Sequence, residues 1–462
     1  MATAAQNDKF IRMTTLPVKK LVGELAIPSI VSMLISSVYN IVDTFFVGRL
    51  DTQSSAALGV VFSYMSIIQS IAFFFGQGAG NYISRSLGSR NLKGAEQMAS
   101  VGFFSTIFTG VILEVTGFLS MDPLLDFLGS TPTVKPFAAG YFKWILVGTP
   151  FIMGCFSLNN LMRQQGNAMM AMIGIASGAI LNIALDPVLI FGFGMGVEGA
   201  GLATAISQAV SFVLLLILSG KKGGIKLRFS LFRPTWKHYT EIAAGGLPSL
   251  FRQGLGAIAA ICFNQVARTY GDEALAAFSI VSRIMMFCAA AMVGYGQGFQ
   301  PVCGFNFGAG NYDRVRKAFW HAWRVSTVYC TIFAAVLFIW APQIVTLFRA
   351  DDPEVIRIGS EVLRYQSAVF PLIASIVMTN MFLQNIRKVV PAIITAALRN
   401  GLSFIPAIYL GQLLLGFFGV EIAHTVSDVV SFLISAPICL AALNGMGKNR
   451  TPDLLKSTED TK

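Results

Sequence analysis

Long apolar runs alternate with short polar segments along this chain, and this pattern constrains its fold more than any other feature. The runs are about 20 residues or longer, the length that an α-helix needs to cross a hydrocarbon core of about 30 Å. Because lipid offers no hydrogen bonds to backbone groups, such segments must be helical. We predict twelve spans, at residues 21–47, 54–81, 95–119, 137–162, 167–192, 199–219, 240–268, 274–300, 315–341, 360–386, 391–415 and 417–444. The predicted fold class is an all-α membrane protein.

The distribution of charge supports this class and gives an orientation. Only 12% of the 462 residues are charged and 54% are hydrophobic. The net charge of +11 is concentrated in alternate loops, which hold 23 of the 34 Lys and Arg residues. Basic loops remain in the cytoplasm, so both termini are predicted to be cytoplasmic and no nucleic-acid partner is needed to explain the charge. Residues 1–20 lack the apolar core of a cleaved signal peptide, so the first span is expected to direct insertion.

Residues that carry enzyme chemistry or bind metals are not grouped. The six cysteines stand singly in or beside apolar runs, and the three histidines are scattered. We find no HExxH motif, nucleophile elbow or Walker A motif. The sequence therefore predicts neither an enzyme nor a bound cofactor.

The two halves of the chain repeat each other at a shift of 220 residues. This shift places Pro28-Ser29 on Pro248-Ser249 and the GQG at 76–78 on the GQG at 296–298. Six spans per copy give parallel repeats, which can enclose a central cavity and expose it alternately to each side of the membrane. The predicted organisation is a cytoplasmic N-terminus, an N-lobe, a cytoplasmic linker, a C-lobe and a cytoplasmic tail, at 1–20, 21–219, 220–239, 240–444 and 445–462. We expect a monomer.

Ionisable residues within spans are costly and default to function. In the N-lobe, Asp43 has Asn40 three residues before it, and Asp186 has Asn182 four residues before it, so each pair shares a helical face. Thr204 is expected at a similar depth. Oxygen atoms gathered there would suit a proton or a hard cation such as Na⁺ at Asp43 and Asp186. The alternative is that these groups only bond neighbouring helices or reach the outer surface.

Two further predictions concern movement and substrate binding. Pro28 lacks a backbone donor, so it is predicted to act as a hinge in the first span, although a packing irregularity is the alternative. In the C-lobe the candidates for a substrate cavity are Arg252, Gln253, Asn264, Gln297, Asn380 and Asp428. Asp428 would either attract a cationic substrate or pair with Arg252, Arg283 or Arg399.

Several segments resemble the multidrug and toxic compound extrusion (MATE) family. They are PSIVSMLISSVYNIVDTFFVGRL (28–50), GQGAGNYISRSLGSRNLKGA (76–95), LNIALDP (181–187) and GYGQGFQPVCGFNFGAGNYDRVRKA (294–318), and EALAAFSIVSRIMMF (273–287) is similar to the MepA-like branch. The resemblance implies two six-helix bundles, antiport of drugs against H⁺ or Na⁺, and no nucleotide hydrolysis. It also implies a DinF-type N-lobe cation site at Asp43, Asn182, Asp186 and Thr204, with Tyr141 nearby and bending at Pro28. Where other branches carry a glutamate, this chain has Arg252 and Gln253, which argues against a second cation site.

The resulting expectation is a multi-pass, prokaryotic cell-membrane antiporter for amphipathic, mostly cationic drugs. A major facilitator transporter is a rival, but the loop at 82–94 lacks that fold's charged motif. A lipid-linked sugar flippase of the wider exporter superfamily remains an alternative, because it would also have a cationic central cavity.

Overall fold

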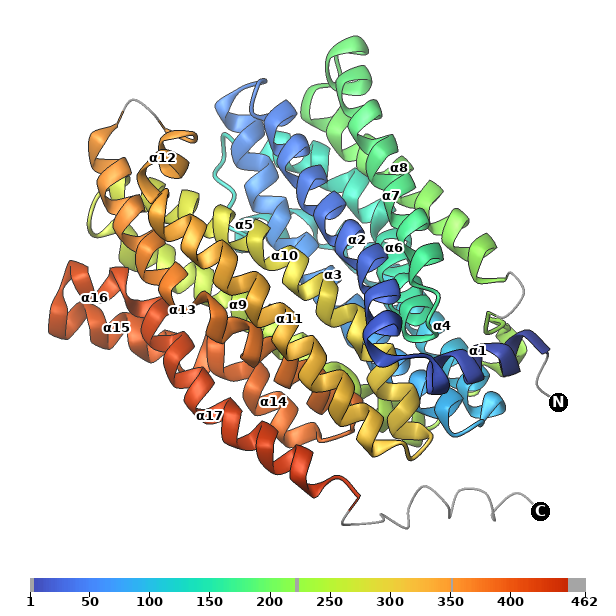
Figure 1. Cartoon of the computed structure of the whole chain (residues 1–462). Helices are drawn as coiled ribbons and strands as arrows, with labels where there is room; N and C mark the ends of the chain where they lie inside the picture. Colours follow the sequence, from blue (N-terminus) through green and yellow to red (C-terminus); the bar gives the residue numbers. More distant parts are fainter. Residues whose placement is uncertain (1–3, 221–223, 350–351, 448–462) are drawn as a thin grey trace.

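The computed structural model describes residues 4–220, 224–349 and 352–447, and every regular element in these ranges is helical. Twelve helices are long and apolar enough to cross a membrane. They form two bundles that lie side by side, one built from each half of the chain (Figure 1). The predicted fold class, an all-α membrane protein of two six-helix bundles, is confirmed. Lys221, Lys222 and the tail from 448 onward lie outside the described residues.

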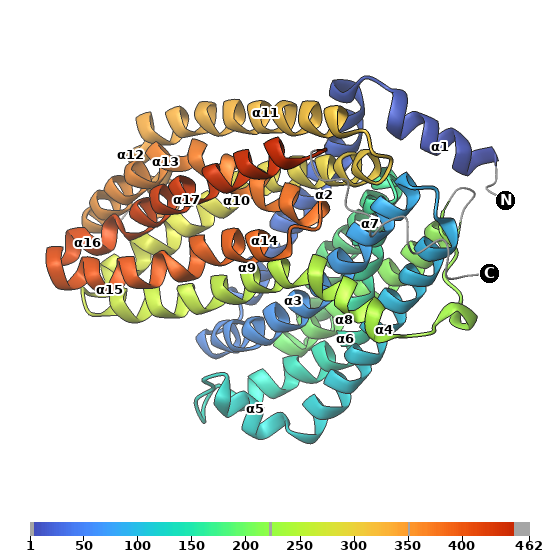
Figure 2. The same ribbon diagram turned by 90° about the horizontal axis from the view of Figure 1, so that it is seen from below.

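The N-lobe spans are α2 (Val18–Val47), α3 (Thr52–Gly88), α4 (Leu92–Leu119), α6 (Lys135–Gln164), α7 (Ala168–Pro187) with the π-helical η1 (Val188–Gly192), and α8 (Gly196–Ser219). The C-lobe spans are α9 (Trp236–Arg268), α10 (Asp272–Gly308), α11 (Tyr312–Ile339), α13 (Pro353–Asn385), α14 (Val389–Ala397) continued by η3 (Leu398–Leu402) and α15 (Phe404–Leu415), and α17 (Ala423–Gly445). Shorter helices are α1 (Ala4–Thr15), α5 (Met121–Phe127), η2 (Phe229–Leu231), α12 (Ala341–Thr346) and α16 (Phe417–Glu421). Seen from below, α2, α3, α9 and α10 lie where the two bundles meet (Figure 2).

Several predicted span ends differ from the helices. Helices α3 and α10 continue to Gly88 and Gly308, beyond the predicted ends at 81 and 300. Their additional turns carry Arg85 and Asn306, whose polar side chains are buried by neighbouring helices instead of marking a loop. The last span begins at Ala423 because the preceding residues form the separate short helix α16.

The lobes contact each other mainly through the cytoplasmic halves of α2, α3, α9 and α10. A Cβ on Gly78 would lie 2.2 Å from the carbonyl oxygen of Ile242, and one on Gly88 would lie 2.1 Å from that of Phe305. Small residues let membrane helices approach this closely. Since these contacts fall at the start of α9 and near the ends of α3 and α10, the lobes are joined on the cytoplasmic side. We interpret the conformation as outward-facing.

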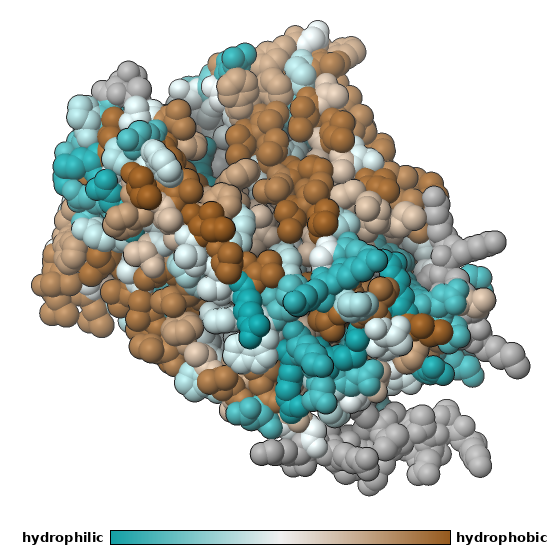
Figure 3. Space-filling view, viewed as in Figure 1, coloured by the Kyte–Doolittle hydropathy of each residue, from teal (hydrophilic) through white to brown (hydrophobic). Residues whose placement is uncertain are grey.

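Helix α1 adds to this cytoplasmic closure. Lys9 Nζ donates to Asn167 Oδ1 of the N-lobe at 2.8 Å, and the Asn306 amide of the C-lobe donates to the carbonyl of Met13 at 3.1 Å. The space-filling view shows hydrophobic residues over the flanks of the bundles and hydrophilic residues gathered at the cytoplasmic end (Figure 3). Exposed side chains such as Ile180 and Leu433 belong to this apolar surface, as expected for contact with lipid.

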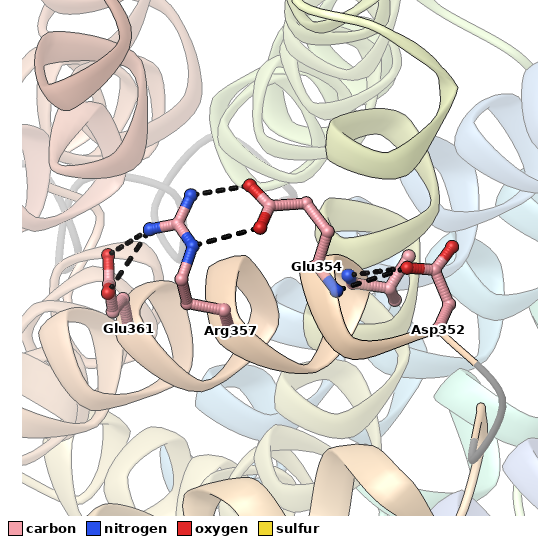
Figure 4. A network of polar contacts seen from close by, with 5 residues as sticks. Asp352, Glu354, Arg357 and Glu361 are labelled. Atoms are coloured by element: carbon pink, nitrogen blue, oxygen red, sulfur yellow. Dashed lines mark hydrogen bonds and ion pairs between the residues drawn. The ribbon is translucent and has the colours of Figure 1, made fainter.

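The outer end of α13 begins with a capped and charged turn. Asp352 accepts hydrogen bonds from the backbone N–H groups of Glu354 and Val355, at 3.1 and 3.2 Å (Figure 4). Arg357 then pairs with Glu354 at 2.6 Å and with Glu361 at 3.4 Å. A side-chain cap satisfies donors that the first turn leaves free, so this turn fixes where α13 starts.

Candidate cation-binding site

The structure brings together four of the predicted N-lobe residues from three helices. Asp43 lies on α2, Asn182 and Asp186 lie on α7, and Thr204 lies on α8. All four side chains are buried, and Asp186 has no exposed surface. The residues lie toward the outer ends of their helices, where the lobes do not make the close contacts found on the cytoplasmic side.

Asn182 connects the members of this group on α7 and α8. In the amide orientation that satisfies both of its ends, Asn182 donates to Asp186 Oδ2 at 3.1 Å and accepts from the Thr204 backbone N–H at 3.3 Å. Asn182 and Asp186 are four residues apart on one helix, so their contact follows from helical geometry. The carboxylate of Asp186 is thereby held toward α8.

Asp43 leaves one oxygen atom without a donor. Its Oδ1 is buried and accepts no hydrogen bond from any described residue. Neither Asp43 nor Asp186 has an ion-pair partner within the described ranges, yet they are close enough to interact electrostatically. A buried carboxylate oxygen that accepts no hydrogen bond favours the binding of a proton or a cation. The described residues contain no cluster of three His, Cys, Asp or Glu side chains, so the donors fit a proton or Na⁺ better than a transition metal.

Two tyrosines complete the surroundings of the carboxylates. Tyr141 on α6 is fully buried, and its hydroxyl group donates to the sulfur of Met65 at 3.9 Å; Tyr39 on α2 is half-buried, and both tyrosines lie near Asp43 and Thr204. Gly201 allows α8 to approach α6, since a Cβ there would lie 2.8 Å from the Tyr141 carbonyl oxygen. Sequence reasoning missed Tyr39, although its position four residues before Asp43 places both on one face of α2.

The structure does not bring Asn40 into this group. Its side chain is exposed, and its amide donates to the backbone carbonyl of Ser36 at 2.8 Å. At about 100° per residue, Asn40 and Tyr39 lie on opposite sides of Asp43 around the helix. Only Tyr39 turns toward α8.

Pro28 lies at the contact between α2 and the C-lobe. The helix continues through Pro28, which is buried. On α10, a Cβ on Gly294 would lie 2.6 Å from the Cα of Ile30, and one on Gly298 would lie 2.4 Å from the Cα of Ala26. A change of bend at Pro28 would therefore alter the packing between the lobes.

The six predicted cavity residues of the C-lobe do not form one group. Arg252 donates to Asn380 Oδ1 at 3.4 Å, while Asn380 also bonds to the Ala392 carbonyl at 2.8 Å. The Nε2 of Gln253 is buried and has no partner among the described residues, and Asn264 is exposed. Gln297 lies between the lobes, where it accepts from Arg163 of α6 and donates to the sulfur of Met33 at 3.7 Å.

Asp428 is paired within the C-lobe. Its Oδ1 lies 2.8 Å from Nε of Arg399, and its side chain is buried. Asp428 was expected either to attract a cationic substrate or to pair with an arginine, and in the structure it is paired. A carboxylate held in this way is already neutralised by the protein.

A two-lobed bundle of twelve spans, closed on the cytoplasmic side and with unpaired carboxylates buried in one lobe, defines a membrane transporter. The MatE family model matches residues 28–188 and again residues 248–410, so the chain belongs to the MatE family. It is similar to the multidrug export protein MepA of Staphylococcus aureus, with 27% identity over 440 residues and 92% of each chain covered. The corresponding protein of Staphylococcus haemolyticus is 26% identical over 432 residues, with 91% of each chain covered.

A solved structure supports the fold. It is described as the outward-facing conformation of a multidrug resistance MATE family transporter of the MOP superfamily. It matches with a TM-score of 0.90 and 25% identity, covering 97% of this chain and 100% of the solved one. The family and the predicted location, as a multi-pass protein of the cell membrane, are thereby confirmed.

Proposed function

We propose that this protein is a secondary antiporter that exports amphipathic, mostly cationic drugs in exchange for H⁺ or Na⁺. One observation carries this proposal: Asp43 and Asp186 are buried together in the N-lobe without a basic partner among the described residues. The relatives named as multidrug export proteins support drugs as the substrates, and they favour this reading over a lipid-linked sugar flippase. We expect a monomer that acts without nucleotide or prosthetic group.

Coupling follows from the cost of leaving these carboxylates charged in a buried site. When the site faces outward, a proton or Na⁺ neutralises Asp43 and Asp186, with oxygen donors from Thr204, Asn182 and the tyrosines available to Na⁺. The ion shifts the equilibrium between the two orientations only by the difference in its affinity for them. Release to the cytoplasm then restores the charge that favours the opposite transition with a cationic drug bound.

The substrate is proposed to occupy the space between the lobes on the outer side. Gln253 offers a buried amide nitrogen, Nε2, with no partner among the described residues, and Arg252 and Asn380 lie beside each other on neighbouring helices. Asn264 and Gln297 stay candidates at the edges of this region. Asp428 is a weaker candidate, since Arg399 already satisfies it.

The proposal is tested with purified protein in proteoliposomes loaded with ethidium, a cationic amphipathic dye. A pH gradient and a Na⁺ gradient are imposed separately, and dye movement is followed by fluorescence. Dye movement driven by either gradient would support the proposal and identify the coupling ion. A membrane potential supplies about 2.3 kcal/mol per 100 mV for each net charge moved, so clamping the potential separates electroneutral from electrogenic exchange. Transport that requires ATP and ignores both gradients would overturn the antiporter proposal.

A further inference from the structure

A buried ion-pair cluster joins the lobes on the cytoplasmic side, away from the proposed cation site. Arg85 extends from α3 of the N-lobe into the C-lobe. There its Nη2 lies 3.3 Å from Glu241 of α9, and its Nη1 donates to the backbone carbonyl of Asn385 at the end of α13, also at 3.3 Å. Both Arg85 and Glu241 are more than nine-tenths buried, at 7% and 9% exposure. Arg85 is thus an N-lobe side chain held in a C-lobe socket.

Glu241 holds two arginines at once. Its second carboxylate oxygen lies 2.5 Å from Nη2 of Arg387, which follows α13 in the C-lobe. Arg85 and Arg387 are close enough to repel each other. The cluster has two positive charges and one negative charge, so Glu241 is the group that makes the approach of the two arginines favourable.

Arg387 has an uncommon backbone conformation at the end of α13. Its φ of 59° lies in the left-handed region, which glycine adopts easily and arginine rarely does. In the N-lobe the corresponding turn after α6 has Gly166 in the same region, with a φ of 80°. A side chain in such a conformation persists where surrounding contacts hold it, and such positions are common at switch regions. Backbone hydrogen bonds at the end of α13, from the N–H of Arg387 to Gln384 and from that of Lys388 to Leu383, hold this turn and direct the Arg387 side chain to Glu241.

The repeat shows that close packing alone does not require this ion pair. The 220-residue shift places Phe305 of α10 opposite Arg85 of α3, and their backbones pack in the same way: a Cβ on Gly88 would lie 2.1 Å from the carbonyl oxygen of Phe305, and one on Gly308 would lie 2.0 Å from that of Arg85. The backbones of the two lobes therefore meet symmetrically, whereas only the α3 position carries a charged side chain. Removing the charge of Glu241 takes away both attractive contacts and leaves the repulsion between Arg85 and Arg387.

We propose that Glu241 is the latch of a cytoplasmic gate, and that Arg85 must leave it each time the lobes part on this side. The proposal rests on the alternating-access part of the proposed function. In the closed state Glu241 bridges Arg85 and Arg387; in the open state Arg85 is withdrawn with α3 and Arg387 retains Glu241 within the C-lobe. The latch therefore sets how often the transporter faces the cytoplasm.

This arrangement predicts an unusual pattern of double-variant effects. Glu241→Gln keeps the side-chain volume but leaves Arg85 and Arg387 facing each other across the lobe boundary, so their repulsion favours opening. Adding Arg85→Gln removes one of the two like charges, so the double variant should return toward the closed state. A residue that only supports folding would instead give losses that add when the two substitutions are combined.

The experiment measures distances between spin labels at the exposed cytoplasmic positions Lys93 of α4 and Lys317 of α11, after replacement of the six native cysteines. We expect the population with the longer distance to rise about tenfold in Glu241→Gln, and at least half of this rise to be lost when Arg85→Gln is added. The control is Glu354→Gln, which breaks the exposed pair with Arg357 inside one helix at the outer end (Figure 4). It should leave the distances as in wild type.

Two further measurements keep the outcomes separate. Size-exclusion chromatography and thermal unfolding identify variants that fail to fold, and Glu241→Asp, which keeps the charge, should stay closer to wild type than Glu241→Gln. If the wild-type distances change with pH or Na⁺ but those of a folded Glu241→Gln are identical to wild type, the latch is overturned while alternating access stands. If no variant or condition ever lengthens the distance, alternating access through this end fails and the latch fails with it.

Discussion

The two lobes share one fold, but the equivalent of the N-lobe cation site in the C-lobe is aromatic. The 220-residue shift places Phe263 opposite Asp43 and His424 opposite Thr204. His424 stacks on Phe404 with ring centroids 4.1 Å apart, and its ring lies 5.2 Å from that of Phe263. Packed rings therefore occupy the region where the N-lobe gathers carboxylate, amide and hydroxyl groups.

From this difference we infer that duplication kept the scaffold and left charge movement to one lobe. A buried carboxylate without a partner is costly, so it persists where its neutralisation performs work. In the C-lobe spans, the buried carboxylate of Asp428 is instead paired with Arg399 and that of Glu241 with Arg85 and Arg387. Glu421 is buried too, with Oε1 lacking a partner among the described residues, but it lies on the short helix α16 outside the candidate spans. We infer that the C-lobe contributes packing and substrate contacts, whereas the N-lobe senses the ion.

The sharpest test of this contrast removes the N-lobe carboxylates. Asp43→Asn and Asp186→Asn keep the side-chain volume but abolish titration, so each should reduce ion-driven ethidium transport to the level of protein-free vesicles. Expression and chromatographic behaviour should be close to wild type. Thr204→Val removes a neutral oxygen and should reduce transport less.

Glu114 supplies the matched control for this test. It is another carboxylate in an N-lobe span, but it lies on α4 and takes no part in the cluster. Glu114→Gln should retain most of the transport. Full transport by both aspartate variants would show that coupling resides elsewhere.

The second test concerns Asp428, for which we expect an effect on stability. Removing one partner of a buried ion pair costs about 3–5 kcal/mol because the remaining charge is left unpaired. Arg399 is one-third exposed, so water should reduce the cost at this site. Asp428→Asn should therefore lower the unfolding temperature, and the double variant with Arg399→Gln should recover part of the loss. A normal unfolding temperature combined with lost ion coupling would mean that the C-lobe also carries a coupling charge.

The third test compares the two equivalent prolines, Pro28 of α2 and Pro248 of α9. Spin labels at the outer ends of α2 and α7 should report distances that vary with pH or Na⁺ in wild type. Pro28→Ala restores a backbone donor and stiffens the helix that carries Asp43, so it should reduce this response while ion binding persists. Pro248→Ala should change the response less, since α9 carries no equivalent carboxylate. If Pro28→Ala and Pro248→Ala reduce the spin-label response equally, the bending of α2 does not depend on the N-lobe carboxylates.

The sequence allowed much of this architecture to be predicted, because span length and the positive-inside rule depend only on composition along the chain. The ends of α3 and α10 were wrong because Arg85 and Asn306 look like loop residues until the opposite lobe buries them. Asp186 and Asn182 were placed together correctly on one face because one helix fixes their spacing. The ion pair of Asp428 with Arg399 joins different helices, so the sequence left it as one of several alternatives. The cluster of Arg85, Glu241 and Arg387 was not predicted at all, since it combines three distant segments.

The smallest expected difference separates two neighbouring residues of α2, Tyr39 and Asn40. Both lie within four residues of Asp43, but Tyr39 turns toward Thr204, whereas Asn40 is exposed and bonds to its own helix. Tyr39→Phe removes only the hydroxyl group, an oxygen donor available to the ion, and should weaken the apparent affinity for the coupling ion by a few-fold, in line with about 1 kcal/mol for one polar contact. Asn40→Ala should change that affinity by less than about twofold, since exposed positions away from special features have small effects. Titrating dye transport against the ion concentration measures both variants. A larger effect of Asn40→Ala would mean that α2 rotates during the cycle and brings its other side to the carboxylates, so that the ion meets a different set of oxygens from the one seen in this outward-facing state.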